Sequence, residues 1–157
     1  MNKLNFQLFK LKNKRTSLTI SLFVYLLFLG NLTFSQNINT YDLLITEIMS
    51  DPSPVVGLSE DEFIEIYNNS RNPINLSKTK IQIGSRLFIP ESFLLKPDSF
   101  IVFWDNKIPT LKNNGDSLKI LHENNVIHRV DYTPSMHKSD FKRNGGWSVE
   151  LIDFKKH

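Results

Sequence analysis

The segment that decides the fold is residues 116–131, which read DSLKILHENNVIHRVD. Residues 116–121 and 125–131 are short runs rich in aliphatic residues and bounded by turn residues, which is typical of β-strands. The halves are separated by Glu123-Asn124-Asn125, whose residue types favour a tight turn. We therefore expect an antiparallel β-hairpin here.

Similar short runs fill the chain on both sides of this hairpin. They end at turn residues such as the prolines at 52 and 54, and none from residue 36 onward has the apolar stripe of a long helix. We expect strands over residues 43–49, 62–67, 74–76, 80–83, 86–89, 99–104, 116–121, 125–131 and 147–152. The run 99–104 is the most apolar, so we expect it to lie centrally in its sheet.

This number of short strands in a chain of this size predicts an all-β fold. We expect an immunoglobulin-like β-sandwich of about eight or nine strands rather than a barrel. The chain has no cysteine and hence no disulfide, so burial of alternate side chains between two sheets must stabilise it. The residues expected in the core are Leu44, Ile48, Ile64, Ile66, Leu76, Ile81, Ile83, Ile101, Phe103, Leu118, Ile120, Val130 and Leu151.

The charge of the chain is distributed unevenly. The 157 residues include 40% hydrophobic and 22% charged residues, a globular composition, and carry a formal net charge of +3. Residues 1–35 hold five of the 19 basic groups and no acid, so the remainder carries a net charge of −2. The overall positive charge is therefore no argument for nucleic-acid binding, and we expect none.

Residues 1–35 have the three-part layout of a secretory signal peptide: a basic start, an apolar stretch at 18–29, and the small residues Thr33 and Ser35. We expect cleavage between Ser35 and Gln36, which would leave residues 36–157 as an exported domain, secreted or at the cell surface. The alternative is an uncleaved N-terminal anchor, the only part that would touch a membrane. The dense apolar core of about a dozen residues is short for a spanning helix of ~20 residues.

Several short motifs resemble, in order, the lamin tail domain family. They are residues 42–49 (DLLITEIM), 51–52 (DP), 62–68 (EFIEIYN), 73–76 (PINL), 96–98 (KPD) and 114–120 (NGDSLKI). Residues 145–151 (GGWSVEL) are similar to the exported bacterial branch of that family. The resemblance spans about residues 40–153, and it implies an immunoglobulin-like β-sandwich without catalysis of its own.

The resemblance also implies a contact role, so we expect a protein or glycan of the cell envelope as the partner. Strand addition at an exposed sheet edge is one way in which such a module binds. Relatives normally continue beyond the position where this chain ends, at His157. The alternative is therefore a domain truncated at its C-terminus, the N-terminal accessory domain of a larger exported hydrolase.

Carboxylates crowd the first third of the mature chain and are candidate Ca²⁺ ligands. They are Glu47, Asp51, Glu60, Asp61, Glu62 and Glu65. Their spacing matches no known calcium loop such as the EF-hand, so we favour a solvated loop at 60–62 and paired strand residues at Glu47 and Glu65. A glycosidase-type pair of Glu47 and Glu65 would need a fixed carboxylate separation that a sequence does not reveal.

The remaining candidates are histidines and a basic segment. His122 and His128 could share a metal with Asp131 across the hairpin, but they form no metal-binding signature, and we expect them to be exposed. Basic residues near Phe141 and Trp147 could bind phosphate or an acidic glycan, although a solvated loop beside a core tryptophan is the simpler interpretation. They are Lys138, Lys142, Arg143, Lys155 and Lys156. We expect no catalytic residue, no metal and no cofactor, and hence no enzyme.

Overall fold

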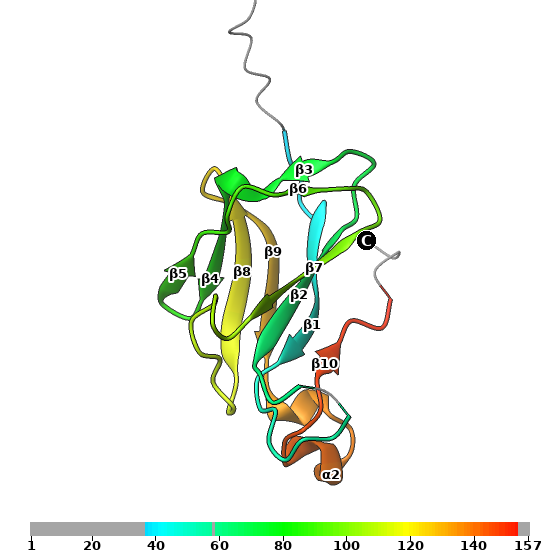
Figure 1. Ribbon diagram of the computed structural model, residues 1–157. Helices are drawn as coiled ribbons and strands as arrows, with labels where there is room; N and C mark the ends of the chain where they lie inside the picture. Colours follow the sequence, from blue (N-terminus) through cyan, green and yellow to red (C-terminus); the bar gives the residue numbers. More distant parts are fainter. Residues whose placement is uncertain (1–36, 58, 154–157) are drawn as a thin grey trace, which may run out of the picture. The chain divides into compact units, whose positions relative to one another are not determined.

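The strands follow the predicted runs closely in the computed structural model, which describes residues 37–57 and 59–153 (Figure 1). The strands are β1 (Leu43–Met49), β2 (Phe63–Asn68), β3 (Ile74–Asn75), β4 (Thr79–Ile83), β5 (Arg86–Phe88), β6 (Leu94–Leu95), β7 (Phe100–Trp104), β8 (Asp116–His122), β9 (Asn125–Tyr132) and β10 (Val149–Glu150). Three short helical turns join them: η1 (Leu76–Lys78), η2 (Pro134–Met136) and α2 (Asp140–Arg143). Only the two-residue β6 has no counterpart among the predicted strands.

The strands form two four-stranded antiparallel sheets and one small ribbon. The first sheet has the order β10-β1-β2-β7, the second has the order β5-β4-β8-β9, and β3 pairs with β6. The predicted all-β, immunoglobulin-like sandwich is confirmed. The proposed signal peptide and its cleavage site lie outside the described residues, and within the described residues no helix is long and apolar enough to cross a membrane.

The core lies between the two sheets and is built by alternation along the strands. Leu43 and Ile45 face inward from β1, and a bulge at Thr46 shifts the phase so that Ile48 faces inward too. Ten of the 13 predicted core residues are buried, whereas Ile101, Val130 and Leu151 are only half-buried. Leu44 is fully buried but lies on the opposite face of β1 from Leu43, outside this core cluster.

The predicted hairpin is confirmed and its turn is tight. β8 and β9 are joined by Glu123 and Asn124 alone, with φ angles of 49° and 72°. Two successive positive φ angles match the right-handed twist of the flanking strands. The register then shifts by one residue between Leu121 and Ile120, so the turn and this bulge together set the pairing that places Leu118 and Ile120 in the core.

Candidate functional site

β7 is an edge strand, and the prediction of a central position for residues 99–104 is wrong. The run is apolar because both of its faces make ring contacts. On the inner face Phe103 packs against Phe88, with ring centroids 5.2 Å apart. On the outer face the Trp104 ring lies 5.1 Å from Phe63, and the Phe100 ring lies 4.7 Å from Tyr67. The apolar composition of a strand therefore indicates that both of its faces are in contact with other side chains. It does not indicate whether the strand has one or two neighbours in its sheet.

A groove opens between the edges of the two sheets. One wall is the inner face of β7, and the other is the end of β5 with the segment that follows it. We call it the edge groove; its lining includes Phe88, Ile89, Phe93, Ile101, Phe103 and Lys107. Its volume is about 320 Å³. The groove therefore exposes core-type side chains along the free edge of β7.

The wall of the edge groove that follows β5 carries apolar side chains that are unusually exposed. Ile89 is 61% exposed and Phe93 is 49% exposed. They lie on either side of Pro90 in residues 89–93, the segment that follows the end of β5 and belongs to no strand. Glu91 and Ser92 also line the groove, so its polar groups are few. Apolar surface rimmed by a few polar groups is typical of protein interaction sites.

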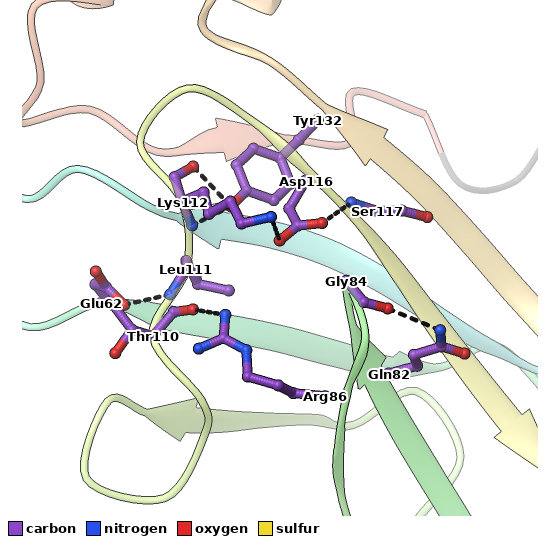
Figure 2. A network of polar contacts seen from close by, with 10 residues as sticks. All are labelled: Glu62, Gln82, Gly84, Arg86, Thr110, Leu111, Lys112, Asp116, Ser117 and Tyr132. Atoms are coloured by element: carbon purple, nitrogen blue, oxygen red, sulfur yellow. Dashed lines mark hydrogen bonds and ion pairs between the residues drawn. The ribbon is translucent and has the colours of Figure 1, made fainter.

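The connection from β7 to β8, residues 105–115, forms the end of the groove and is held by a polar network (Figure 2). Glu62 Oε2 accepts the Leu111 N–H at 2.6 Å. The Tyr132 hydroxyl accepts the Lys112 N–H and donates to the Lys112 carbonyl oxygen, both at 2.9 Å. The Arg86 guanidinium donates to the Thr110 carbonyl oxygen. Burial raises the pKa of Tyr132 to about 12, so this phenol stays protonated and keeps its donor.

Asp116 closes this network from the start of β8. Its Oδ1 accepts the Ser117 N–H at 2.8 Å, and its Oδ2 lies 3.2 Å from the Lys112 ammonium. Burial alone would raise the pKa of Asp116, but the Ser117 hydrogen bond and Lys112 outweigh burial and lower it. A lowered folded-state pKa means that the ionised carboxylate stabilises the fold.

The lowered pKa of Asp116 predicts how the stability of the domain changes in acid. The stabilisation from Asp116 is present above the ordinary Asp pKa near 3.8 and is lost as the pH falls through the lower folded-state value. We expect Asp116→Asn to lower the free energy of unfolding at pH 7 by about 1–2 kcal/mol, because a charge-assisted hydrogen bond is lost. The loss should shrink toward pH 2. Urea unfolding at both pH values checks this, and an equal loss at both would contradict it.

The six candidate calcium ligands do not converge. Glu60 and Asp61 are exposed in the loop before β2, as predicted, and Asp61 accepts the Ser59 hydroxyl at 2.6 Å. Glu62 accepts a hydrogen bond from the Leu111 N–H, and Asp51 lies beyond the end of β1. Within residues 37–57 and 59–153, no group of three or more His, Asp or Glu side chains is placed to hold a metal ion.

Glu47 and Glu65 lie directly opposite each other on β1 and β2. The pKa of Glu47 is raised, mainly by burial and also by the nearby Glu150 and Glu65 charges. A hydrogen bond with Ser148 acts in the opposite direction. The Glu65 Oε1 accepts the Thr46 hydroxyl at 2.7 Å. Both glutamates are thus strand residues with hydroxyl partners, the arrangement of a structural pair.

The two hairpin histidines are buried, and the expectation that they are exposed is wrong. His122 is 5% exposed and His128 is 8% exposed, because both face into the sandwich from β8 and β9. His128 Nδ1 accepts the Ile45 N–H at 3.0 Å, which joins β9 to β1. Both nitrogens of His122 are buried without a hydrogen-bond partner among the described residues. Asp131 pairs with Arg129 at 2.9 Å and lies on the exposed side of β9.

The basic segment surrounds a half-buried tryptophan. The Lys142 ammonium lies 4.2 Å from the centroid of the Trp147 ring, and Phe141 contacts the same ring edge-on. Arg143 is paired with Asp140, so its charge is compensated locally. Lys138 is exposed, and Lys155 and Lys156 lie outside the described residues. This arrangement agrees with the predicted solvated loop, but the prediction of a core tryptophan is wrong, because Trp147 is half-buried and lies outside the core cluster.

The comparisons agree with the fold. The sequence pattern of the lamin tail domain matches residues 36–134, more than half of the chain, and this range includes β1 to β9 and both walls of the edge groove. No curated protein and no solved structure matches the chain. The match ends before residues 145–151, so it does not bear on the predicted exported bacterial branch. On the match and the sandwich together, the chain belongs to the lamin tail domain family.

Proposed function

We propose that this chain is an exported, non-catalytic module that binds a protein of the cell envelope in the edge groove. The observation that carries the proposal is the edge groove itself: about 320 Å³ of apolar space beside an unpaired strand edge. Lamin tail domains are immunoglobulin-like interaction modules, which supports a binding role. The signal-peptide layout of residues 1–35 supports export to the cell surface or beyond.

The chemistry of the groove favours a protein over a glycan. Its walls are aliphatic and aromatic, and its polar side chains are Glu91, Ser92 and Lys107. A sugar brings many hydroxyl groups that need hydrogen-bond partners once they are buried. Apolar peptide side chains need none. The same shortage of polar groups supports a role without catalysis, because acid–base chemistry needs titratable groups placed together.

Two exposed residues, two positions apart in the chain, allow a matched test of the groove. Ile89 is 61% exposed and lines the groove, whereas Leu87 is 59% exposed and does not line it. Since both are mostly exposed, aspartate at either position should change the free energy of unfolding little. Only Ile89→Asp places a charge in the apolar groove, so only this variant should lose binding, by about tenfold or more.

The measurement is site-specific crosslinking of the full chain in cells that produce it. A photoreactive phenylalanine analogue at Phe93, in the groove, should give one discrete protein adduct, and at Phe141, which is 70% exposed elsewhere, it should not. The adduct should disappear in Ile89→Asp and persist in Leu87→Asp. No adduct at Phe93, equal adducts at both positions, or binding to envelope polysaccharide alone would overturn the proposed function.

A further inference from the structure

We propose that the partner occupies the edge groove as an extended segment that pairs antiparallel with β7, as a fifth strand of the first sheet. The segment carries apolar side chains at two alternate positions and an acidic residue near its amino end. This inference rests on the proposed function and specifies how the groove is used. Four features of the groove support it: the unguarded edge, its hydrogen-bond register, the volume beside it and the charge at its end.

β7 is the longest unguarded edge of the sandwich. β10 has two residues and β5 has three, so neither offers a long template. β9 carries the exposed pair Arg129 and Asp131, and its Ile127 carbonyl oxygen already accepts the Tyr41 N–H. By contrast, β7 reads FIVFW, with no charge and no proline. Proteins normally guard free edges with such residues, so an edge without them is suited to strand addition.

The hydrogen-bond register points the right groups outward. The Asn68 N–H donates to the Ser99 carbonyl oxygen, and the Asp105 N–H donates to the Glu62 carbonyl oxygen. Bonded pairs alternate in an antiparallel ladder, so positions 101 and 103 bond to β2 while positions 100, 102 and 104 face away. The Trp104 carbonyl oxygen is taken by the Lys107 and Ile108 N–H groups. Positions 100 and 102 and the N–H of 104 thus form a row open to a partner strand.

The same register puts the partner's side chains into the groove. Residues opposite each other in a sheet point to the same face, so partner residues opposite Ile101 and Phe103 share their inner face. That face is the wall of the edge groove. Its volume is about 320 Å³. A cavity of about 150 Å³ accepts one benzene molecule, so the groove holds roughly two apolar side chains.

The charge at the end of the groove sets the partner's polarity. Lys107 is exposed, lines the groove just after the carboxyl end of β7, and belongs to none of the ion pairs among the described residues. An antiparallel strand begins at this end, so an acidic residue near its amino end would meet Lys107. Glu91 lines the facing wall and disfavours a partner with several acidic residues.

The test uses a synthetic nine-residue peptide, one aspartate followed by alternating threonine and valine, with the full chain labelled for amide NMR. We expect the amide hydrogens of Phe100, Val102 and Trp104 to exchange roughly tenfold or more slowly when the peptide is bound. The amides of Ile101 and Phe103 already bond to β2 and should change little. The control peptide has the same composition, with the aspartate followed by the repeat Thr-Thr-Val-Val, so that no two valines stand at alternate positions.

Two changes remove only the proposed pairing. Val102→Pro deletes an outward N–H and leaves the ladder to β2 intact, so peptide binding should weaken about tenfold or more while the fold is kept. N-methylation of the peptide at the residue opposite Val102 should act equally and leaves the protein unaltered, so the test stands even where the proline variant fails to fold. Lys107→Ala should weaken binding of the peptide that carries aspartate and should leave binding of its asparagine analogue unchanged.

The outcomes separate this inference from the proposed function. Peptide binding without protection at positions 100 and 102, or binding that is insensitive to N-methylation, overturns strand addition and leaves the groove as the docking site. A partner crosslinked at Phe93 while the alternating peptide does not bind also overturns strand addition alone. No adduct at Phe93, together with failure of the alternating peptide to bind, overturns both proposals.

Discussion

Replacing Gly115 with alanine should lower the free energy of unfolding by about 3 kcal/mol or more. Gly115 precedes β8 with a φ of +107°, a conformation that side-chain-bearing residues rarely adopt. A Cβ there would lie 2.4 Å from the Tyr132 carbonyl oxygen. The contact is with main chain at the end of β9, so no side-chain rotation relieves it. Either β8 or β9 must shift, and this pair of strands carries the hairpin on which the second sheet is built.

Gly57 supplies the matched control. Its φ is +76°, and a Cβ built there meets nothing within 4 Å. Gly57→Ala should therefore cost only the backbone preference, about 1–2 kcal/mol. Urea unfolding of both variants, followed by tryptophan fluorescence, compares the two losses. Equal losses would show that the close approach to Tyr132 does not limit this corner of the fold.

The position of Gly115 also connects stability to the proposed binding site. Residues 105–115 run from the end of β7 to β8 and include Lys107 at the end of the edge groove. The Gly115 N–H donates to the Lys112 carbonyl oxygen, which also accepts the Tyr132 hydroxyl. The groove end is thus fixed by contacts to β9, which belongs to the other sheet. A module that binds through a rigid groove loses less conformational entropy on binding.

The sequence predicted those features that depend on local pattern. Short alternating or apolar runs bounded by turn residues located nine of the ten strands, and turn residues located the hairpin, because strand pattern and turn chemistry act over a few residues. β6 was not predicted because two leucines at 94–95 carry no period. Core residues were identified well for the same local reason, except at the sandwich margins, where Ile101, Val130 and Leu151 are half-buried.

The candidate site depends on features that are not local. The order of strands within a sheet is set by pairings between distant residues, so the apolar run 99–104 was assigned to the centre although it forms an edge. The edge groove arises because β5 ends at Phe88 and leaves Ile89 and Phe93 beside β7, far away in sequence. Ile89 stands directly before Pro90, which ends the run, and that proline was the available signal.

The two buried histidines should respond in opposite directions when each is replaced by leucine. His128→Leu removes the acceptor for the Ile45 N–H, a buried donor in β1, and should lower the free energy of unfolding by about 1–3 kcal/mol. His122 has no hydrogen-bond partner among the described residues, and neither does the buried hydroxyl of Thr79 opposite it on β4. His122→Leu removes two unsatisfied polar atoms from an apolar site and should raise the free energy of unfolding by about 1 kcal/mol or more.

Thr79→Val extends the same argument, because it removes the second unsatisfied group and keeps the branched shape that suits β4. The double variant His122→Leu, Thr79→Val should be at least as stable as His122→Leu alone, since neither change leaves a new unpaired group. Thermal and urea unfolding of the three single variants and the double variant give the comparison. A loss of stability in His122→Leu similar to that in His128→Leu would show that His122 has a bound partner in solution, such as an internal water, that satisfies its ring nitrogens.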